Sequence, residues 1–139
     1  MIDSNFIKNT KLEILNVSRE TLNELNNFST SILKRNRKIN LISSSSEKSI
    51  NTRHIADSAQ IIDFIDKNDI KICTDLGSGA GLPGIVLAIL MKPKKPHFKV
   101  IFYEKSYHKS NFLKEISKKF KLNTEINQKD IFEQKNLQT

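Results

Sequence analysis

The chain has 139 residues, of which 37% are hydrophobic and 27% charged, and its formal net charge is +8 at pH 7. This composition predicts one globular domain and excludes a disordered chain, while no apolar run approaches the roughly 20 residues of a membrane span and the N-terminus lacks the pattern of a signal peptide. A single cysteine, Cys73, excludes an intrachain disulfide, so we expect a cytoplasmic protein that does not associate with membranes.

Residues 1–69 predict a helical extension. Apolar residues spaced three and four apart indicate a helix from Ser18, its N-cap, to about Lys38. A shorter helix is expected before it, around residues 7–15. The apolar stripe of the longer helix consists of Leu22, Leu25, Phe28, Ile32 and Leu33.

A serine-rich loop follows at residues 40–46. Ser44 and Glu47, three positions apart, have the spacing of a capping box, which predicts that a second helix begins there and runs to about Ile65. Its buried side is expected to contain Ile50, Ile61, Phe64 and Ile65.

Residues 70–139 alternate between strand and helix patterns. Strands are expected at 70–75, 99–103 and 124–127, and apolar helices at 82–91 and 110–120. The order β-α-β-α-β predicts an α/β fold with a parallel sheet and right-handed crossovers. We treat the two halves of the chain as parts of a single domain.

The motif DLGSGAGLPG, residues 75–84, lies between the first strand and its helix and contains all four glycines of the chain. Glycine allows positive φ and lets a ligand approach the backbone, so the motif predicts a ligand cradle at the carboxyl end of the strand. The spacing G-x-G-x-G differs from the dinucleotide and nucleoside triphosphate motifs. S-adenosylmethionine (SAM), which has no phosphate, is the candidate ligand. An unliganded tight turn is the alternative.

Three carboxylates complete this predicted site. Glu104 ends the second strand, where an acidic side chain can accept hydrogen bonds from both ribose hydroxyls. Asp75 is placed to hold the ammonium group of the cofactor, directly or through water, and Asp130 follows the third strand within reach of an adenine amino group. The alternative for Glu104 and Asp130 is that both are ordinary surface acids. No metal site is predicted.

A second polar cluster occupies the second helix. Arg53 and Asp57, and likewise His54 and Ser58, are four residues apart and therefore share one side of a helix. One interpretation is that the cluster faces the pocket or a nucleic acid. The other is that it is a surface ion pair beside an incidental histidine, and the spacing alone favours this second interpretation.

Basic residues are scattered along the chain. They could follow the phosphates of a nucleic acid, because neutralising phosphates releases condensed counterions, although a solvated surface is the default explanation. They are Lys34, Arg35, Arg37, Lys38, Lys92, Lys94, Lys95, Lys118, Lys119 and Lys121.

Taken together, these motifs resemble a known family. Asn40-Leu41, then Arg53-His54-x-x-Asp57-Ser58, then residues 75–85 (DLGSGAGLPGI) are similar to the bacterial small-subunit (16S) ribosomal RNA guanine-N7 methyltransferases, also called glucose-inhibited division protein B. The resemblance covers most of the chain in the order of the family.

The resemblance implies a Rossmann-like SAM-dependent methyltransferase fold with an N-terminal helical extension, SAM as methyl donor, and guanine N7 of small-subunit ribosomal RNA as acceptor. The RNA would be bound free or in the assembled small subunit, by a monomer. Arg53, His54 and Asp57 would position the substrate. The residues expected to bind the cofactor are Asp75, Gly77, Gly79, Gly81, Leu82, Glu104, Asp130 and Ile131. Glu104 stands where the family usually has aspartate.

The family continues for several strands beyond the third, whereas this sequence ends at Thr139. We therefore expect an incomplete sheet and a chain truncated at its C-terminus. The alternative function is that of an inactive remnant, or half of a split methyltransferase that needs a C-terminal fragment. A nucleotide-dependent oxidoreductase is a further alternative, which the glycine spacing disfavours.

Overall fold

Three parallel strands form the centre of the fold: β1 (Ile72–Leu76), β2 (Lys99–Tyr103) and β3 (Thr124–Asn127), in the order β1-β2-β3. The computed structural model describes residues 17–48, 50, 57, 60–77 and 79–130. The predicted α/β class and β-α-β-α-β order are confirmed, and the arrangement is that of part of a Rossmann-like fold.

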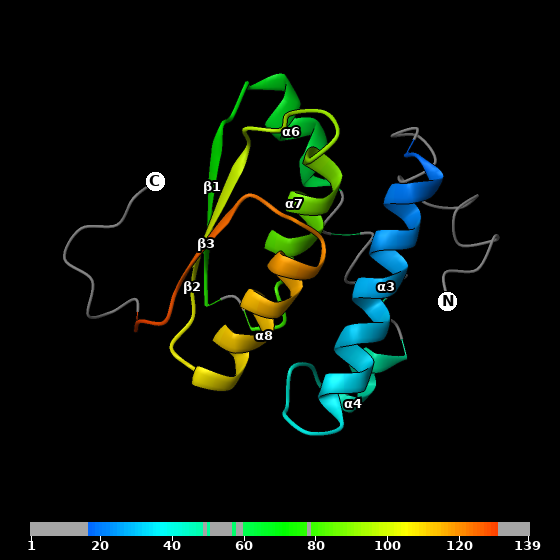
Figure 1. Cartoon of the computed structure of the whole chain (residues 1–139), viewed down its shortest axis with the longest axis vertical. Helices are drawn as coiled ribbons and strands as arrows, with labels where there is room; N and C mark the ends of the chain where they lie inside the picture. The colour runs from blue at the N-terminus through cyan, green and yellow to red at the C-terminus, as the bar shows by residue number, and fades with distance from the viewer. Residues whose placement is uncertain (1–16, 49, 51–56, 58–59, 78, 131–139) are drawn as a thin grey trace.

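The two crossover helices, α7 (Gly84–Met91) and α8 (Tyr107–Lys119), lie on the same face of the sheet (Figure 1). Helix α3 (Arg19–Asn36) packs on the side of α7 that faces away from the sheet. All eight residues of α7 are buried, because the helix lies between the sheet and α3. This position explains its apolar sequence on every side.

Helix α3 begins where the sequence predicts. The hydroxyl of Ser18 accepts a hydrogen bond from the Thr21 amide at 3.2 Å and caps the first turn. Leu25, Phe28 and Ile32 have no exposed surface and join the core formed with α7 and the sheet. The periodicity therefore predicted these three buried positions correctly. Of the other two residues in the predicted stripe, Leu22 is partly buried against the core, whereas Leu33 is not among the core residues.

Lys92 links three helices at one end of this helical layer. It is the C-cap of α7, and its Nζ donates to Glu24 Oε2 of α3 at 2.7 Å and to the carbonyl oxygen of Phe120, the C-cap of α8, at 2.8 Å. A cation at the carboxyl end of a helix also stabilises the helix dipole. The helical extension is therefore joined to the sheet domain by polar bonds as well as by apolar packing.

The expected single helix from Ser44 to Ile65 is wrong. Helix α4 (Ser44–Glu47) ends after four residues, with Lys48 as its C-cap. Its N-cap is Ser43, whose hydroxyl accepts from the Ser46 amide at 3.2 Å. The expected capping box does not form, because the N-cap is one residue earlier than Ser44 and Glu47 is therefore not the third residue of the helix. The Glu47 side chain instead accepts a 2.6 Å hydrogen bond from Asn36.

The buried face of the next helix, α6 (Ile61–Lys67), also differs from the expectation. Ile62 and Ile65 are buried, as is Ile50, but Phe64 is 61% exposed and Ile61 is 37% exposed. One face of so short a helix can contact α7, and residues three apart share that face.

Smaller shifts affect the ends of the other elements. Helix α7 begins at Gly84 instead of Leu82, with Pro83 as its N-cap. Helix α8 begins at Tyr107, three residues earlier than expected, with Ser106 as its N-cap. β1 begins at Ile72, and the other two strands have the predicted bounds. No helix in the described ranges is long and apolar enough to cross a membrane.

Candidate functional site

A cavity of about 310 Å³ lies at the carboxyl ends of the three strands. Parallel α/β sheets bind ligands at this edge, because the loops that leave the strands meet there. The loops after β1, β2 and β3 and the first turn of α8 all contribute to it. Its lining residues are Gly77, Gly79, Tyr103, Glu104, Lys105, Lys109, Lys129 and Asp130.

The loop after β1 turns sharply beneath this cavity. Gly77, Gly79 and Gly81 have φ values of 68°, 54° and 89°, which favour glycine. A Cβ placed on Gly77 or Gly79 meets no described atom within 4 Å, so the backbone there is open to the cavity. Gly81 is different, because a Cβ there would collide with Ile85 and would lie 2.9 Å from Leu113 Cδ2. The first two glycines thus form an open cradle, and the third allows close packing.

Glu104 fastens this loop to the end of β2. One carboxylate oxygen accepts from the Gly79 amide at 2.8 Å, and the other accepts from the Ser106 amide at 3.1 Å. Glu104 is only 7% exposed, yet it lines the cavity. Each carboxylate oxygen has two lone pairs, so both can accept a further hydrogen bond from a ligand.

Asp75 fastens the other end of the loop. Its Oδ2 accepts from the Gly84 amide at 3.0 Å, in the first turn of α7. Burial raises the pKa of Asp75 to about 6; the hydrogen bond from Gly84 lowers it, and the nearby charge of Glu104 raises it. The ionised carboxylate is thus destabilised in the absence of a cation.

These two carboxylates determine which ligand charge the loop can accept. A phosphate bound by a glycine-rich loop uses free backbone amides and the N-terminus of the following helix. Here the amides of Gly79 and Gly84 already donate to carboxylates. A phosphate at the same amides would lose these donors and would be repelled by two negative charges. The loop favours a ligand that is cationic near the glycines and has hydroxyl donors near Glu104.

The structure brings together four of the predicted cofactor-binding residues, Gly77, Gly79, Glu104 and Asp130, around one cavity. Three others do not line it. Asp75 caps α7, and Gly81 and Leu82 pack against the core. Ile131 lies outside the described residues.

The predicted positioning cluster is described only at Asp57. This residue is exposed, and its Oδ1 accepts a 3.5 Å hydrogen bond from the side-chain amide (Nε2) of Gln60. Arg53, His54 and Ser58 lie outside the described residues, as does the helix expected around residues 7–15. The role of this cluster stays a prediction.

Sequence reasoning missed four residues that line the cavity: Tyr103, Lys105, Lys109 and Lys129. Two of the lysines directly neighbour predicted carboxylates in the sequence, which could have indicated them. Tyr103 is the last residue of β2, and alternation along the strand turns its side chain away from the face that Phe102 shares with the helices. Lys109 could be placed only once α8 was known to begin before Ser110.

The pKa of Asp75 leads to a prediction about stability. In the unfolded chain this carboxyl titrates near 3.8, and in the folded chain near 6, so the folded state binds the proton more tightly. The contribution of the protonated Asp75 carboxyl to the free energy of unfolding is complete below about pH 4 and is lost as the pH rises through 6. Asparagine does not ionise, so Asp75→Asn does not have this loss. We therefore expect the free energy of unfolding of the variant, relative to that of the parent chain, to increase by about 2–3 kcal/mol from pH 4 to pH 8.

Urea unfolding of both proteins is monitored by circular dichroism at several pH values. The contributions of the other titrating groups cancel in the difference between the two free energies of unfolding. A difference that stays constant from pH 4 to pH 8 would show that Asp75 does not titrate in this way.

Comparison with known proteins adds an independent line of evidence. The family model described as "rRNA small subunit methyltransferase G" (GidB) matches residues 21–139. A protein of Pelagibacter ubique (strain HTCC1062) named ribosomal RNA small subunit methyltransferase G is 51% identical over 124 residues, which are 88% of this chain and 58% of that protein. A protein of the same name from Ruegeria pomeroyi is 44% identical over 100 residues, covering 72% of this chain and 48% of the relative.

Proposed function

Because the chain belongs to the rRNA small subunit methyltransferase G family, we propose that it takes part in SAM-dependent methylation of guanine N7 in small-subunit ribosomal RNA. The chain spans about half the length of the curated relatives that it matches. We propose that it acts as a cytoplasmic monomer on the RNA or on the assembled small subunit.

The observation that carries the cofactor assignment is the pair of carboxylates on the loop amides. SAM has a sulfonium and an ammonium group, which are both cationic, and it has no phosphate. Glu104 and Asp75 accept hydrogen bonds from the amides of Gly79 and Gly84. Two carboxylates at these amides would attract a cationic ligand and would repel the pyrophosphate of a dinucleotide. A cavity of about 310 Å³ also lies in the usual range for cofactor pockets. The residues present therefore fit SAM.

Each polar residue has a proposed partner on the cofactor. Glu104 accepts hydrogen bonds from the two ribose hydroxyls through the lone pairs that the Gly79 and Ser106 amides leave free. Asp130, at the end of the cavity after β3, accepts from the adenine amino group. Asp75 attracts the ammonium group, directly or through water, and the open backbone at Gly77 leaves room for the methionine portion.

The bound cofactor supplies an electrophilic methyl group. Guanine N7 is a hydrogen-bond acceptor with an in-plane lone pair, so it needs no general base before it attacks. The task of the protein is then to orient N7 in line with the methyl group and to exclude water, which can account for most of the rate enhancement. No residue of the proposed site is therefore assigned the role of a general base, and Arg53, His54 and Asp57 are proposed to position the RNA.

The first test is isothermal titration of the folded chain with SAM, with S-adenosylhomocysteine and with NAD. We expect both SAM and its demethylated product to bind and NAD not to bind. Transfer of label from methyl-labelled SAM to unmethylated small ribosomal subunits tests the activity, and digestion of the RNA to nucleosides identifies the methylated atom.

Binding and transfer answer different questions. If the chain binds SAM but transfers no methyl group, the cofactor assignment stands. The result then supports the alternative that the chain alone is not an active enzyme. The cofactor assignment would be refuted by a folded chain that releases no heat with SAM or with its product, or that binds NAD more tightly than SAM.

A further inference from the structure

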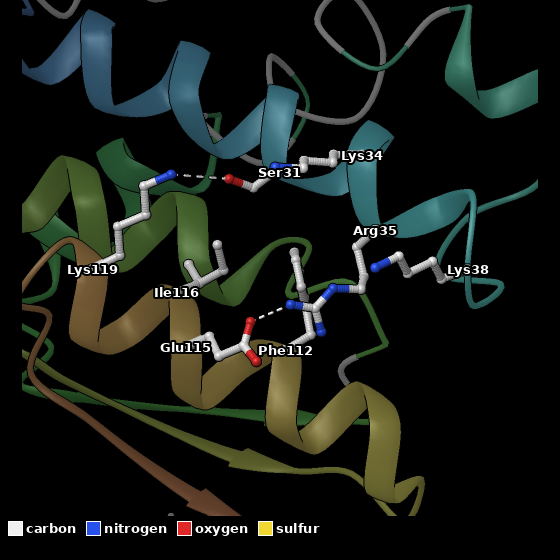
Figure 2. Close-up of a pocket in the computed structure, with 8 residues that line it drawn as sticks. All are labelled: Ser31, Lys34, Arg35, Lys38, Phe112, Glu115, Ile116 and Lys119. Atoms are coloured by element: carbon white, nitrogen blue, oxygen red, sulfur yellow. Dashed lines mark hydrogen bonds and ion pairs between the residues drawn. The ribbon is translucent and has the colours of Figure 1, made fainter.

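A second concave surface lies between α3 and α8, away from the loop after β1 (Figure 2). This groove, which we call the α3–α8 groove, has a volume of about 360 Å³. One wall carries Lys34, Arg35 and Lys38, from the end of α3 and the turn after it. The other carries Phe112, Glu115 and Lys119 of α8. Phe112, Glu115 and Lys119 are three and four residues apart and therefore share one side of α8. On α3, Lys34 and Arg35 lie three and four residues after Ser31, which also lines the groove.

Arg35 is held at the centre of the groove. Its guanidinium forms an ion pair with Glu115 and lies over the ring of Phe112, with Cζ 5.5 Å from the ring centroid. Figure 2 shows the Arg35 side chain reaching across toward α8. Cation–π contact and the ion pair limit the rotamers of the arginine, so its remaining N–H donors have a fixed direction.

The lysines around Arg35 leave the groove strongly basic. Lys34 and Lys38 are exposed, and within the described ranges neither of them forms an ion pair. At the other end of the groove, the Lys119 ammonium donates to the Ser31 hydroxyl at 3.3 Å, as drawn in Figure 2. Four basic side chains therefore surround a single carboxylate, that of Glu115.

We propose that the α3–α8 groove binds the phosphate backbone of the RNA substrate, at a site separate from the cofactor pocket. A planar guanidinium donates to phosphate oxygens in fork geometry, and flexible lysines on both sides add charge without demanding a base sequence. Compensation of the α3 dipole accounts for Lys34 and Arg35 near the end of their own helix. The same effect accounts for Lys119 in the last turn of α8. It does not account for Lys38, which lies beyond the end of α3, or for the concave surface that brings all four side chains together.

Helix α8 connects the two sites. Lys109, in its first turn, lines the cofactor pocket, whereas the stripe from Phe112 to Lys119 lines the α3–α8 groove. An RNA held in the groove therefore lies along the same helix that borders the proposed site of methyl transfer. This inference rests on the proposed RNA substrate but not on SAM binding, so the two can fail separately.

The test compares two variants with the same change of charge. Lys34→Gln/Lys38→Gln removes two groove lysines, and Lys67→Gln/Lys71→Gln removes two exposed lysines at the end of α6 and just before β1. Each protein is titrated into a fluorescein-labelled 20-nucleotide single-stranded RNA at several NaCl concentrations. We expect the groove variant to bind about tenfold more weakly at low salt and to lower the slope of log K against log [NaCl] by about 1.4, since each lost phosphate contact removes about 0.7.

The control variant should keep the slope of the parent chain. Thermal unfolding and SAM titration of both variants show whether each is folded and has its cofactor site intact. Equal weakening of RNA binding by the two variants, or an unchanged salt slope in the groove variant, would overturn the proposal. If the parent chain does not bind SAM but the groove variant still binds RNA more weakly than the control variant, only the cofactor assignment is refuted.

Discussion

Replacing Gly81 with alanine is expected to lower the free energy of unfolding by about 2–5 kcal/mol. Gly81 has φ of 89°, where an L-residue costs about 1–2 kcal/mol. A Cβ there would also collide with the Ile85 side chain and approach Leu113 Cδ2 to 2.9 Å. Overfilling a packed core typically costs a further 1–3 kcal/mol. Chemical denaturation followed by circular dichroism measures the loss.

Gly79→Ala provides the matched control. Gly79 also has positive φ, 54°, but its added Cβ meets no described atom within 4 Å. It should therefore lose only the backbone contribution of about 1–2 kcal/mol, while its methyl group, at the cavity wall, weakens SAM binding. Equal destabilisation by the two substitutions would mean that steric contact at Gly81 does not matter.

Glu104→Gln is expected to weaken SAM binding by roughly 30- to 1,000-fold. We propose that the carboxylate accepts hydrogen bonds from two ribose hydroxyls, and a hydrogen bond to a charged group contributes about 1.5–3 kcal/mol. A glutamine has one acceptor oxygen, and its NH₂ would face the amide of either Gly79 or Ser106, both of which now donate. Losing about 2–4 kcal/mol of binding free energy corresponds to that range. Isothermal titration at fixed pH gives the affinities.

A modified ligand separates loss of ribose contacts from distortion of the loop. An S-adenosylhomocysteine analogue that lacks the 2′-hydroxyl should bind the parent chain more weakly than the unmodified ligand, and Glu104→Gln should bind the two almost equally. Glu104→Asp, which keeps the charge, should bind better than Glu104→Gln. If the analogue loses as much affinity with the Gln variant as with the parent chain, Glu104 does not contact that hydroxyl.

The sequence predicts the sheet half of the fold most accurately. Strands 99–103 and 124–127 were placed with the bounds that the structure has. Their apolar residues are short runs bounded by polar or turn residues, so local pattern and tertiary position agree. The clustering of glycines likewise placed the loop at the correct edge, because only a few residue types can adopt positive φ.

The errors arise where tertiary contacts decide. The pattern predicts Phe64 on the buried side of its helix beside Ile65, but Ile62 and Ile65 are the buried residues of α6, which packs against α7. The apolar run predicts that the helix begins at Leu82, but the turn continues to Pro83, which is the N-cap of α7. Proline favours the first turn of a helix, so its presence does not show at which of these residues the helix begins.

The ammonium of Lys92 lies where the C-terminal ends of two helices and a glutamate of the third meet. One partly exposed cation therefore joins α3, which precedes the sheet in the chain, to the two crossover helices. Melting any one of the three helices removes one of the groups that this cation holds together. We accordingly expect the leading helix and the nucleoside-sized pocket to come apart in one cooperative step, so that the pocket does not outlast its helical cover.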